Sequence, residues 1–464
     1  MTKARWMGLL LVLFSSGISV WWGCSLGRTQ YGGPFDFRAV YYGTRTLLQQ
    51  QNPYSARDVE VVCRTGGEEN SSLTLRQRCR DVWFINTPGT LLLIAPFAAL
   101  PLGPSQVLWT ILMAACLTVA AFLVWDFGAD IAPVLSGCLV GFLVANCQIL
   151  FGGGNSAGIV VSLCVVAAWC FIMDRFAVGG ILCMAVSLVI KPHDTGLVWL
   201  YFLLAGGVYR KRALQTASLA ALLTLPAVLW VSHSAPDWMQ HWQSNLDSTT
   251  APGGLNDPRP ASLPDLRTGN IISLQAVFSI FRDNPQFYNW ASYLVCGVPL
   301  LLWAVTTMRS RTSPYHAWLA LAAIVPFTVL VTYHRGYDAK LLLLTIPACV
   351  ILWSKGGPLG WTALVLNAAG IVLNADLPQV MLGALIRGMH LSTATLSGQI
   401  LTVVLARPNQ EILLVMGAFY LWVYMRRPLV IGASSPTENA AGTETDLSTF
   451  DLDPFQARSM LGGN

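Results

Sequence analysis

Apolar runs of about the length needed to cross a lipid bilayer fill most of this chain. A helical span takes about 20 apolar residues, and backbone within lipid must satisfy its own hydrogen bonds, which favours helices. Only 11% of the 464 residues are charged and 54% are hydrophobic, whereas ordinary soluble domains are about 25% charged. The sequence therefore predicts an all-α, polytopic transmembrane protein. It excludes a soluble enzyme, a disordered protein and a nucleic-acid-binding protein.

Basic residues in the short breaks between apolar runs predict the orientation, because cytoplasmic loops are enriched in lysine and arginine. Lys3 and Arg5 place the N-terminus in the cytoplasm. The other basic breaks expected on that side are at Arg175, Arg210–Arg212, Arg309, Arg311, Lys355, Arg426 and Arg427. The spans expected between them lie near 157–173, 176–190, 195–209, 213–231, 289–307, 316–333, 339–354, 358–375 and 409–425.

We expect four regions and about twelve spans in all. Residues 1–24 form a first transmembrane helix rather than a cleaved signal peptide, because no small-x-small cleavage site follows the apolar run. Residues 25–87 form a large extracytoplasmic loop. This loop holds 14 charged residues, out of 28 basic and 23 acidic residues in the whole chain. Residues 88–425 form the multi-span domain with an outer loop at 232–288, and residues 426–464 form a disordered cytoplasmic tail.

Residues 88–150 contain three apolar runs, near 88–102, 105–125 and 131–150. The loops on both sides of this region are expected outside, so an even number of membrane crossings must join them, and one of the three runs cannot be a full span. The run at 88–102 is short and contains three prolines, so we expect it to be re-entrant, interfacial or a short hairpin. Residues 388–406 are similarly ambiguous and could lie in the membrane interface.

Two of the eleven cysteines, Cys63 and Cys79, lie in the predicted outer loop. They form either a disulfide, as an oxidising compartment permits, or two free thiols. No histidine or cysteine cluster has metal-ligand spacing, so we expect no metal site. Nor does the chain contain a phosphate-binding loop or a dinucleotide fingerprint, which argues against direct use of a nucleotide cofactor.

Asp36 is the first candidate for chemistry on the outer face. It follows a predicted membrane exit and is flanked by Phe35 and Phe37, and an acid in an apolar rim can be tuned to act as a general base. The alternative is an N-cap that starts an amphipathic helix through Tyr41 and Tyr42. Lys191, at the outer end of an apolar helix, is either a snorkelling anchor or a phosphate ligand.

A second polar cluster lies at residues 333–340, between two otherwise uncharged spans. It contains His334, Arg335, Asp338 and Lys340, and ionisable groups at such a depth are usually functional or paired. The alternative is a plain Arg335–Asp338 surface pair. The glycine-containing segments 152–155 and 269–273 are either close approaches to a ligand or simple turns. Ion-coupled transporters require a cluster of ionisable residues within their spans, and the predicted spans contain none. The chemistry is therefore expected at the outer interface.

The order of these short motifs resembles glycosyltransferase family 87, within the C-type (GT-C) superfamily of integral membrane glycosyltransferases. The matching pieces, over about residues 7–375, are Phe35-Asp36-Phe37, Tyr41-Tyr42, Asn52-Pro53-Tyr54, Asn86-Thr87-Pro88, Ala95-Pro96-Phe97, Leu100-Pro101, Trp109, Gly154-Asn155, Lys191-Pro192, Asn270-Ile271-Ile272-Ser273, Tyr333-His334 and Tyr337-Asp338. The chain departs from the family pattern at two motifs, and these departures bear on which substrate is used more than on the fold. The chain has Asn86-Thr87-Pro88 where members often have Tyr-Pro-Pro, and Gly152-Gly153-Gly154-Asn155 where they often have Gly-Gln-x-Asn.

The resemblance implies transfer of a hexose, commonly mannose, from a polyprenyl-phosphate donor to a glycan or glycolipid acceptor, with inversion. Transfer would occur on the outer face of a bacterial cytoplasmic (inner) membrane, with both termini in the cytoplasm and no cofactor beyond the donor. By position, Asp36 is the expected base and His334 a second catalytic candidate. Lys191 and Arg335 are expected to bind the donor phosphate. The expected substrate-binding residues are Tyr41, Tyr42, Asn155, Asn270, Tyr337 and Asp338.

Three rival functions remain open at this stage. A transporter or lipid flippase would need a polar site at the membrane midplane. A non-catalytic component of an envelope-assembly complex would fit the altered motifs at residues 86–88 and 152–155. A polysaccharide ligase or polymerase of related architecture would use a lipid-linked oligosaccharide instead.

Overall fold

The computed structural model describes residues 2–30, 33–65, 79, 84–259, 271–310, 313–389 and 395–426. The chain divides into two units, Met1–Pro428 and Leu429–Asn464. The second unit lies outside the described residues, and with it the predicted disordered tail beyond Arg426. The predicted site residue Asn270 also lies outside them. All that follows concerns the first unit.

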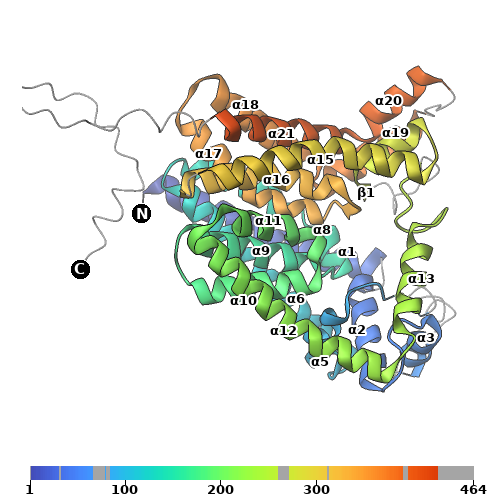
Figure 1. Ribbon diagram of the computed structural model, residues 1–464. Helices are drawn as coiled ribbons and strands as arrows, with labels where there is room; N and C mark the ends of the chain where they lie inside the picture. The colour runs from blue at the N-terminus through green and yellow to red at the C-terminus, as the bar shows by residue number, and fades with distance from the viewer. Residues whose placement is uncertain are drawn as a thin grey trace, which may run out of the picture. The chain divides into compact units, whose positions relative to one another are not determined.

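Helices make up nearly all of the described chain, as predicted, and Figure 1 shows their arrangement. The first half contains α1 (Lys3–Gln30), α2 (Phe35–Leu48), α3 (Ala56–Thr65), α5 (Pro88–Ala98), α6 (Leu102–Ala129), α7 (Pro133–Ala145), α8 (Gln148–Gly153), α9 (Ala157–Ile172), α10 (Ala177–Ile190), α11 (Pro192–Ala205), α12 (Gly207–Ser234) and α13 (Trp238–Thr250). The second half contains β1 (Ile271–Ile272), α14 (Leu274–Phe281), α15 (Pro285–Arg309), α16 (Pro314–Val331), β2 (His334–Arg335), the 3₁₀ helix η2 (Asp338–Thr345), α17 (Ile346–Ser354), α18 (Gly357–Leu373), α19 (Asp376–Gly388), α20 (Leu396–Ala406) and α21 (Pro408–Arg426).

Six helical segments among the described residues are long and apolar enough to cross a membrane, and up to eight if each of two bent helix pairs is one span. The bent pairs are α18 with α19 and α20 with α21, bent by 70° and 74°. Three further apolar helices, α5, α9 and α10, are shorter than a full span. The protein is therefore a helical membrane protein, and the number twelve stays a prediction.

Several predicted boundaries differ from the observed ones. The first helix runs to Gln30, beyond the expected end at residue 24. The suspect run at 88–102 is the short helix α5, Pro88–Ala98, which is too short to cross a bilayer. The expected helix at 339–354 begins instead as the 3₁₀ segment Asp338–Thr345 and becomes α-helical only at Ile346.

The first helix packs closely against α7 and α8 because glycines remove the side chains at the contacts. A Cβ on Gly137 would lie 2.7 Å from the Cα of Gly8, and one on Gly27 would lie 2.8 Å from the carbonyl oxygen of Gly152. Small residues allow such close approach of helix backbones within membranes. The Gly152-Gly153-Gly154 run, which the sequence left as either a ligand approach or a turn, thus has a packing role.

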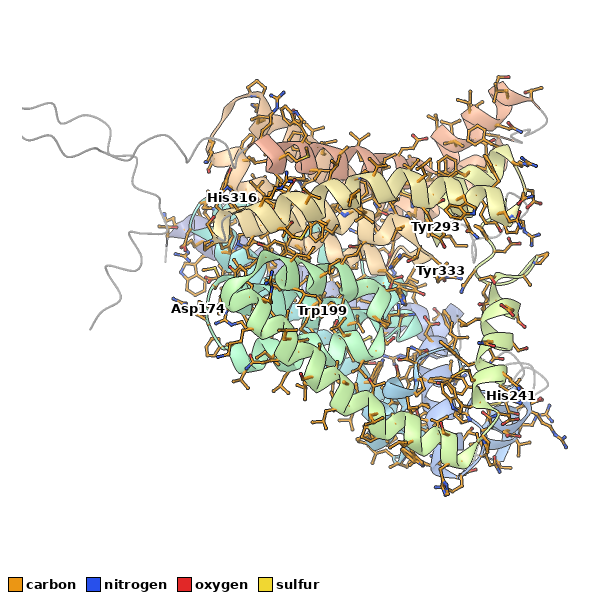
Figure 2. The ribbon with its side chains drawn as sticks, in the orientation of Figure 1. Asp174, Trp199, His241, Tyr293, His316 and Tyr333 are labelled. Carbon is orange, nitrogen blue, oxygen red and sulfur yellow. A yellow bond between two sulfur atoms is a disulfide. The ribbon has the colours of Figure 1, made fainter. Side chains whose placement is uncertain are left out.

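Ion pairs join the helix ends expected on the cytoplasmic side. Arg5 at the start of α1 lies 3.5 Å from Asp126 and 3.0 Å from Asp130, at the end of α6. Arg212 near the start of α12 pairs with Asp174. Figure 2 shows Asp174 at one end of the unit and Tyr333 towards the other.

At that other end, α2, α3 and α13 lie together (Figure 1). The side chain of Asn245 on α13 donates to the carbonyl oxygens of Tyr54 (2.9 Å) and Phe84 (3.1 Å). Asn52 donates to Asp237 over 3.0 Å, and the hydroxyl of Tyr54 donates to the carbonyl oxygen of Asn86 over 2.9 Å. The outer loops are therefore folded together rather than extended.

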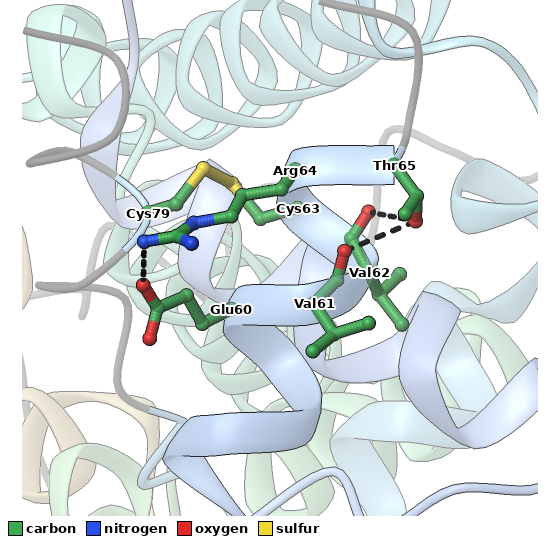
Figure 3. The surroundings of a disulfide bond; sticks show 7 residues. All are labelled: Glu60, Val61, Val62, Cys63, Arg64, Thr65 and Cys79. Atoms are coloured by element: carbon green, nitrogen blue, oxygen red, sulfur yellow. Dashed lines mark hydrogen bonds and ion pairs between the residues drawn. A yellow bond between two sulfur atoms is a disulfide. The ribbon is translucent and has the colours of Figure 1, made fainter. Parts of the chain in front are cut away.

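Cys63, at the end of α3, forms a disulfide with Cys79, 16 residues later (Figure 3). The structure thus selects the disulfide over the two free thiols that the sequence left open. The disulfide cross-links part of the predicted outer loop at residues 25–87.

A two-stranded antiparallel ladder connects two of the motifs. Ile271 pairs with Arg335 and Ile272 with His334. The side chain of Gln410 on α21 also donates to the carbonyl oxygen of Ile271 over 2.7 Å. The 333–338 segment is thus held at a defined place beside the helix ends.

Candidate active site

Asp36 lies in the first turn of α2, where the helix dipole favours a carboxylate. The N-cap of this helix is Pro34, so Asp36 does not have the N-cap role that was its alternative reading. Its Oδ2 accepts a hydrogen bond of 2.7 Å from the side-chain amide of Asn155. The structure thus brings together two of the predicted site residues.

Glycines at residues 153 and 154 allow α2 to approach the end of α8. A Cβ on Gly153 would lie 3.1 Å from Oδ2 of Asp36, and one on Gly154 would lie 2.7 Å from Cβ of Pro34. Gly154 also has a φ of 64°, which favours glycine. The indole of Trp109 donates to its carbonyl oxygen over 2.9 Å. The motif residues Trp109 and Gly154 therefore position Asn155, the partner of Asp36.

Lys191 follows the last residue of α10 and precedes Pro192, the first residue of α11. The hydroxyl of Thr87 donates to the carbonyl oxygen of Val189 over 2.7 Å, in the last turn of α10. The Asn86-Thr87-Pro88 motif thereby holds the helix end that presents Lys191. The side chain of Lys191 is 12% exposed, which is deeper than a snorkelling anchor requires.

The carboxylate of Asp338 bridges Lys191 and the backbone of Arg335. Its Oδ1 accepts from Nζ of Lys191 over 2.8 Å, and its Oδ2 accepts from the backbone nitrogen of Arg335 over 2.8 Å. Asp338 is buried and meets Arg335 through the backbone nitrogen, so this contact is not the surface ion pair that was the alternative reading. An ammonium has three donors. Lys191 is hydrogen-bonded to one oxygen of Asp338 and lies 3.7 Å from Asp194, so it keeps donor capacity for a further anion.

The guanidinium of Arg335 connects the site to the outer loop. Its Nε bonds to the hydroxyl of Tyr333, and its Nη2 donates to the carbonyl oxygen of Leu255 over 2.7 Å. Asp257 organises that loop by accepting from the backbone nitrogen of Gly253 over 2.8 Å and from Nε of Arg259 over 2.7 Å. The 251–259 loop is therefore a neighbour of the site that the motifs did not mark.

His334 is fully buried and faces the start of α11. Its Nδ1 lies 3.1 Å from the carbonyl oxygen of Thr332, and its Nε2 lies 3.2 Å from Oδ1 of Asp194. The same oxygen lies 3.3 Å from Nε2 of His193. His334 thus lies inside the protein, between Thr332 and Asp194. Asp194, whose role the sequence did not suggest, contacts both imidazoles.

Burial raises the pKa of Asp36 above its ordinary value, while the Asn155 hydrogen bond and the charges of Arg335 and Lys191 oppose the rise. Burial and the charge of Asp194 likewise raise the pKa of Asp338. For Lys191, burial opposes the charged form, but Asp194 and Asp338 outweigh it and raise the pKa. Asp36 therefore lies within electrostatic range of Lys191 and Arg335, and its hydrogen-bond donor is the neutral amide of Asn155.

The remaining predicted residues are placed differently. Tyr41 and Tyr42 are buried, and the hydroxyl of Tyr41 donates to the carbonyl oxygen of Leu100 over 2.8 Å. Their rings pack within the protein, so the structure offers no exposed face of Tyr41 or Tyr42 for a sugar. Tyr337 lies against the site, its ring centroid 5.2 Å from Nζ of Lys191. Lys340 is buried elsewhere, 3.3 Å from Asp376.

The described part of the chain thus defines an integral membrane protein with a polar site at the ends of its helices. Its members are the carboxylates of Asp36, Asp194 and Asp338, the cations of Lys191 and Arg335, and aromatic side chains. The family model for glycosyltransferase family 87 matches residues 84–332. The protein belongs to glycosyltransferase family 87 and is a membrane glycosyltransferase by family. A comparison with curated proteins and one with solved structures gave no match. Asp36 precedes the matched region and the 334–338 segment follows it.

Proposed function

We propose that the protein transfers a hexose, in the first instance mannose, from a polyprenyl-phosphate donor to an acceptor hydroxyl, with inversion and with Asp36 as the general base. The observation that carries this proposal is the position of Asp36. Its carboxylate is oriented by Asn155 and lies within electrostatic range of Lys191 and Arg335. A base within the field of two cations suits a reaction in which a proton leaves one oxygen while negative charge develops on another.

In the proposed step, the acceptor oxygen attacks the anomeric carbon while its proton passes to the carboxylate of Asp36. The bond between the anomeric carbon and the phosphate oxygen breaks, and the bonding electrons leave with the polyprenyl phosphate. A single displacement inverts the configuration and needs no carboxylate nucleophile, unlike retaining transfer. The other two carboxylates of the site, Asp194 and Asp338, contact Lys191, which supports a single base.

The leaving phosphate gains a negative charge in this step. Lys191 and Arg335 are the cations proposed to stabilise it, because a positive charge placed where charge develops lowers the barrier. Tyr337, against Lys191, is proposed to line the sugar site. A donor phosphate would share Lys191 with Asp338, so binding is proposed to loosen the 2.8 Å contact between them.

We place the reaction on the outer face of a bacterial cytoplasmic membrane. The Cys63–Cys79 disulfide supports this side, because disulfides persist in oxidising compartments and are rare in the cytoplasm. Polyprenyl-phosphate sugars are membrane-bound donors, and a site at the ends of apolar helices suits a substrate whose lipid tail remains in the bilayer.

The test is transfer of label by membranes that contain the full chain, supplied with radiolabelled polyprenyl-phosphate mannose and an extract of envelope acceptors. Asp36→Asn should abolish transfer, because an amide cannot accept the proton. Asp58→Asn is the matched control, since Asp58 also lies in the first turn of an outer helix but belongs to α3. It should retain wild-type transfer.

Wild-type transfer by Asp36→Asn would remove the base assignment. Absence of transfer by the wild-type chain with a panel of polyprenyl-phosphate hexoses would remove the donor assignment. Appearance of intact donor in the opposite leaflet, without transfer, would instead favour a flippase.

A further inference from the structure

Three side chains from two distant segments converge behind Lys191: His193, Asp194 and His334. One nitrogen or oxygen ligand atom from each lies within 4.8 Å of the others. Oδ1 of Asp194 lies 3.3 Å from Nε2 of His193 and 3.2 Å from Nε2 of His334. Two imidazoles and a carboxylate are a common ligand set for zinc and similar divalent cations.

The 3.2 Å contact between Asp194 and His334 is not aligned as an ordinary hydrogen bond. Within the described residues, neither oxygen of Asp194 nor Nε2 of His334 has a well-aligned hydrogen bond, although both side chains are nearly inaccessible to solvent. Buried polar atoms normally have partners, so such atoms call for an explanation. Ligands of one cation point at the cation rather than at one another, and at metal distances of about 2.1 Å they lie about 3.0–3.5 Å apart. The two Asp194–histidine distances fall in that range.

The other ring nitrogen of His334 strengthens this reading. The carbonyl oxygen of Thr332, 3.1 Å from Nδ1, can only accept a hydrogen bond, so Nδ1 carries a proton. In the neutral ring, Nε2 then has a lone pair directed towards the Asp194 side. Metal-binding histidines almost always donate their second N–H to such a carbonyl or carboxylate.

The surrounding charges leave room for a cation. Nζ of Lys191 lies 3.7 Å from Asp194 on the Oδ2 side, whereas both imidazoles face Oδ1. Asp338 holds the same ammonium at the shorter distance of 2.8 Å. The positive charge of Lys191 is therefore shared with a second carboxylate. The side chain of His193 is 43% exposed, which leaves a path from solvent.

We propose that Nε2 of His193, the carboxylate of Asp194 and Nε2 of His334 bind one divalent cation of the zinc type. Three protein ligands leave at least one coordination position for water or another ligand. This site goes beyond the proposed sugar transfer and does not depend on it, because its ligands are distinct from Asp36 and Asn155.

The test uses the full chain purified in detergent through a tag without histidine. After treatment with a chelator, the protein is dialysed against Zn²⁺ or Co²⁺, and the bound metal is measured by mass spectrometry. We expect about one equivalent per chain, and for Co²⁺ the visible absorption of a four- or five-coordinate ion. Zn²⁺ should also raise the melting temperature of the chelated protein.

His193→Ala should lose the bound equivalent and the Co²⁺ absorption, and it should fold, because this side chain is 43% exposed. His241→Ala is the matched control. His241 is similarly exposed, at 44%, and its Nε2 also contacts an aspartate, Asp237 at 3.1 Å, but it belongs to no three-ligand cluster among the described residues. It should retain the metal. Asp194→Asn provides a second variant of unchanged size, with the same loss expected.

Two results would overturn the proposal. One is wild-type protein that binds less than a tenth of an equivalent of either ion and shows no thermal shift with Zn²⁺, in which case the contact between His334 and Asp194 is held by a proton alone. The other is binding that His193→Ala and Asp194→Asn leave unchanged, which would place the metal elsewhere. Neither result bears on sugar transfer by Asp36, which is measured separately.

Discussion

The carboxylate of Asp36 and the side-chain amide of Asn155, 119 residues apart in sequence, are joined by a hydrogen bond of 2.7 Å. Oδ1 of Asn155 in turn accepts from the backbone nitrogen of Ala157 over 2.9 Å, at the start of α9. A rigid helix end thus fixes the orientation of Asn155, and Asn155 fixes the orientation of the carboxylate. This relay makes Asn155 a positioning residue for the proposed base.

Asn155→Ala should lower transfer about 10- to 100-fold, because it removes the group that orients Asp36. It also removes a hydrogen bond that opposes the rise in the pKa of Asp36, so the acid limb of the pH–rate profile should move to higher pH. Loss of the bond to Ala157 should cost about 1 kcal/mol of stability. A merely structural role would lower the melting temperature without moving the pH profile.

The raised pKa of Asp36 predicts how activity depends on pH. The base works only when ionised, so transfer should fall as the pH drops through a value above the ordinary aspartate pKa of about 3.9. A wild-type profile that stays flat down to pH 4 would contradict this expectation, provided the protein remains folded as monitored by its melting temperature.

The raised pKa of Asp36 also predicts how stability depends on pH. Ionisation of Asp36 favours activity but lowers the stability of the folded protein. A carboxyl whose pKa is higher in the folded than in the unfolded protein favours folding fully only below its unfolded pKa, and that contribution is lost as the pH rises through the folded value. Asp36→Asn should therefore melt at a higher temperature than the wild type at pH 7. The difference should shrink as the pH falls towards 4, and a difference independent of pH would argue against the raised pKa.

Much of the fold follows from the apolar runs, and the reasons for the exceptions are local. The expected spans at 157–173 and 176–190 correspond closely to α9 and α10, because a long apolar run in lipid has little choice but a helix. The 3₁₀ segment at Asp338–Thr345 was not predicted. Its residues are apolar enough for an α-helix, and only tertiary contacts, such as those of Asp338 with Lys191 and the Arg335 backbone, explain its start.

The site was predictable in part. Asp36, Lys191, His334, Arg335 and Asp338 stood out because charge is scarce in this chain. Asn155 came from the family motif, and the structure bonds it to Asp36. Asp194 was overlooked because its partners are not visible locally. His193 is its neighbour in sequence, but His334 lies 140 positions away, and metal-ligand spacing rules search only short segments. Lys340, by contrast, was grouped with His334 by proximity in sequence, although it is buried against Asp376 instead.

The disulfide leads to a prediction for the outer loop. Replacing Cys63 and Cys79 together by serine should destabilise the protein by up to about 3 kcal/mol. This is the effect expected when a disulfide between residues 16 positions apart is removed. The melting temperature in detergent, compared with and without reductant, measures this effect. Reductant should lower the melting temperature of the wild type and leave that of the double variant unchanged. Non-reducing peptide mapping that recovers both thiols free would show that the bond does not form.

Lys340 provides a structural counterpart to Lys191. Its Nζ donates to the carbonyl oxygen of Asn146 over 2.7 Å and lies 3.3 Å from the buried carboxylate of Asp376. Lys340→Met should therefore destabilise the protein by about 3–5 kcal/mol, because it leaves a buried charge unpaired. The KM for the donor, measured on the folded fraction, should not change. A large rise in that KM would place Lys340 in the site after all.

Lys191→Met should act on both stability and donor use, since it leaves Asp338 and Asp194 without the ammonium that contacts them. The single variant should lose a few kcal/mol of stability and should raise the KM for the polyprenyl-phosphate sugar. Adding Asp338→Asn should restore much of the stability, because it removes one of the uncompensated charges, but it should not restore donor use. Thermal melting and donor titrations of the two variants separate these effects. If the double variant also recovers the wild-type KM, Lys191 serves only to neutralise Asp338 and does not bind the donor phosphate.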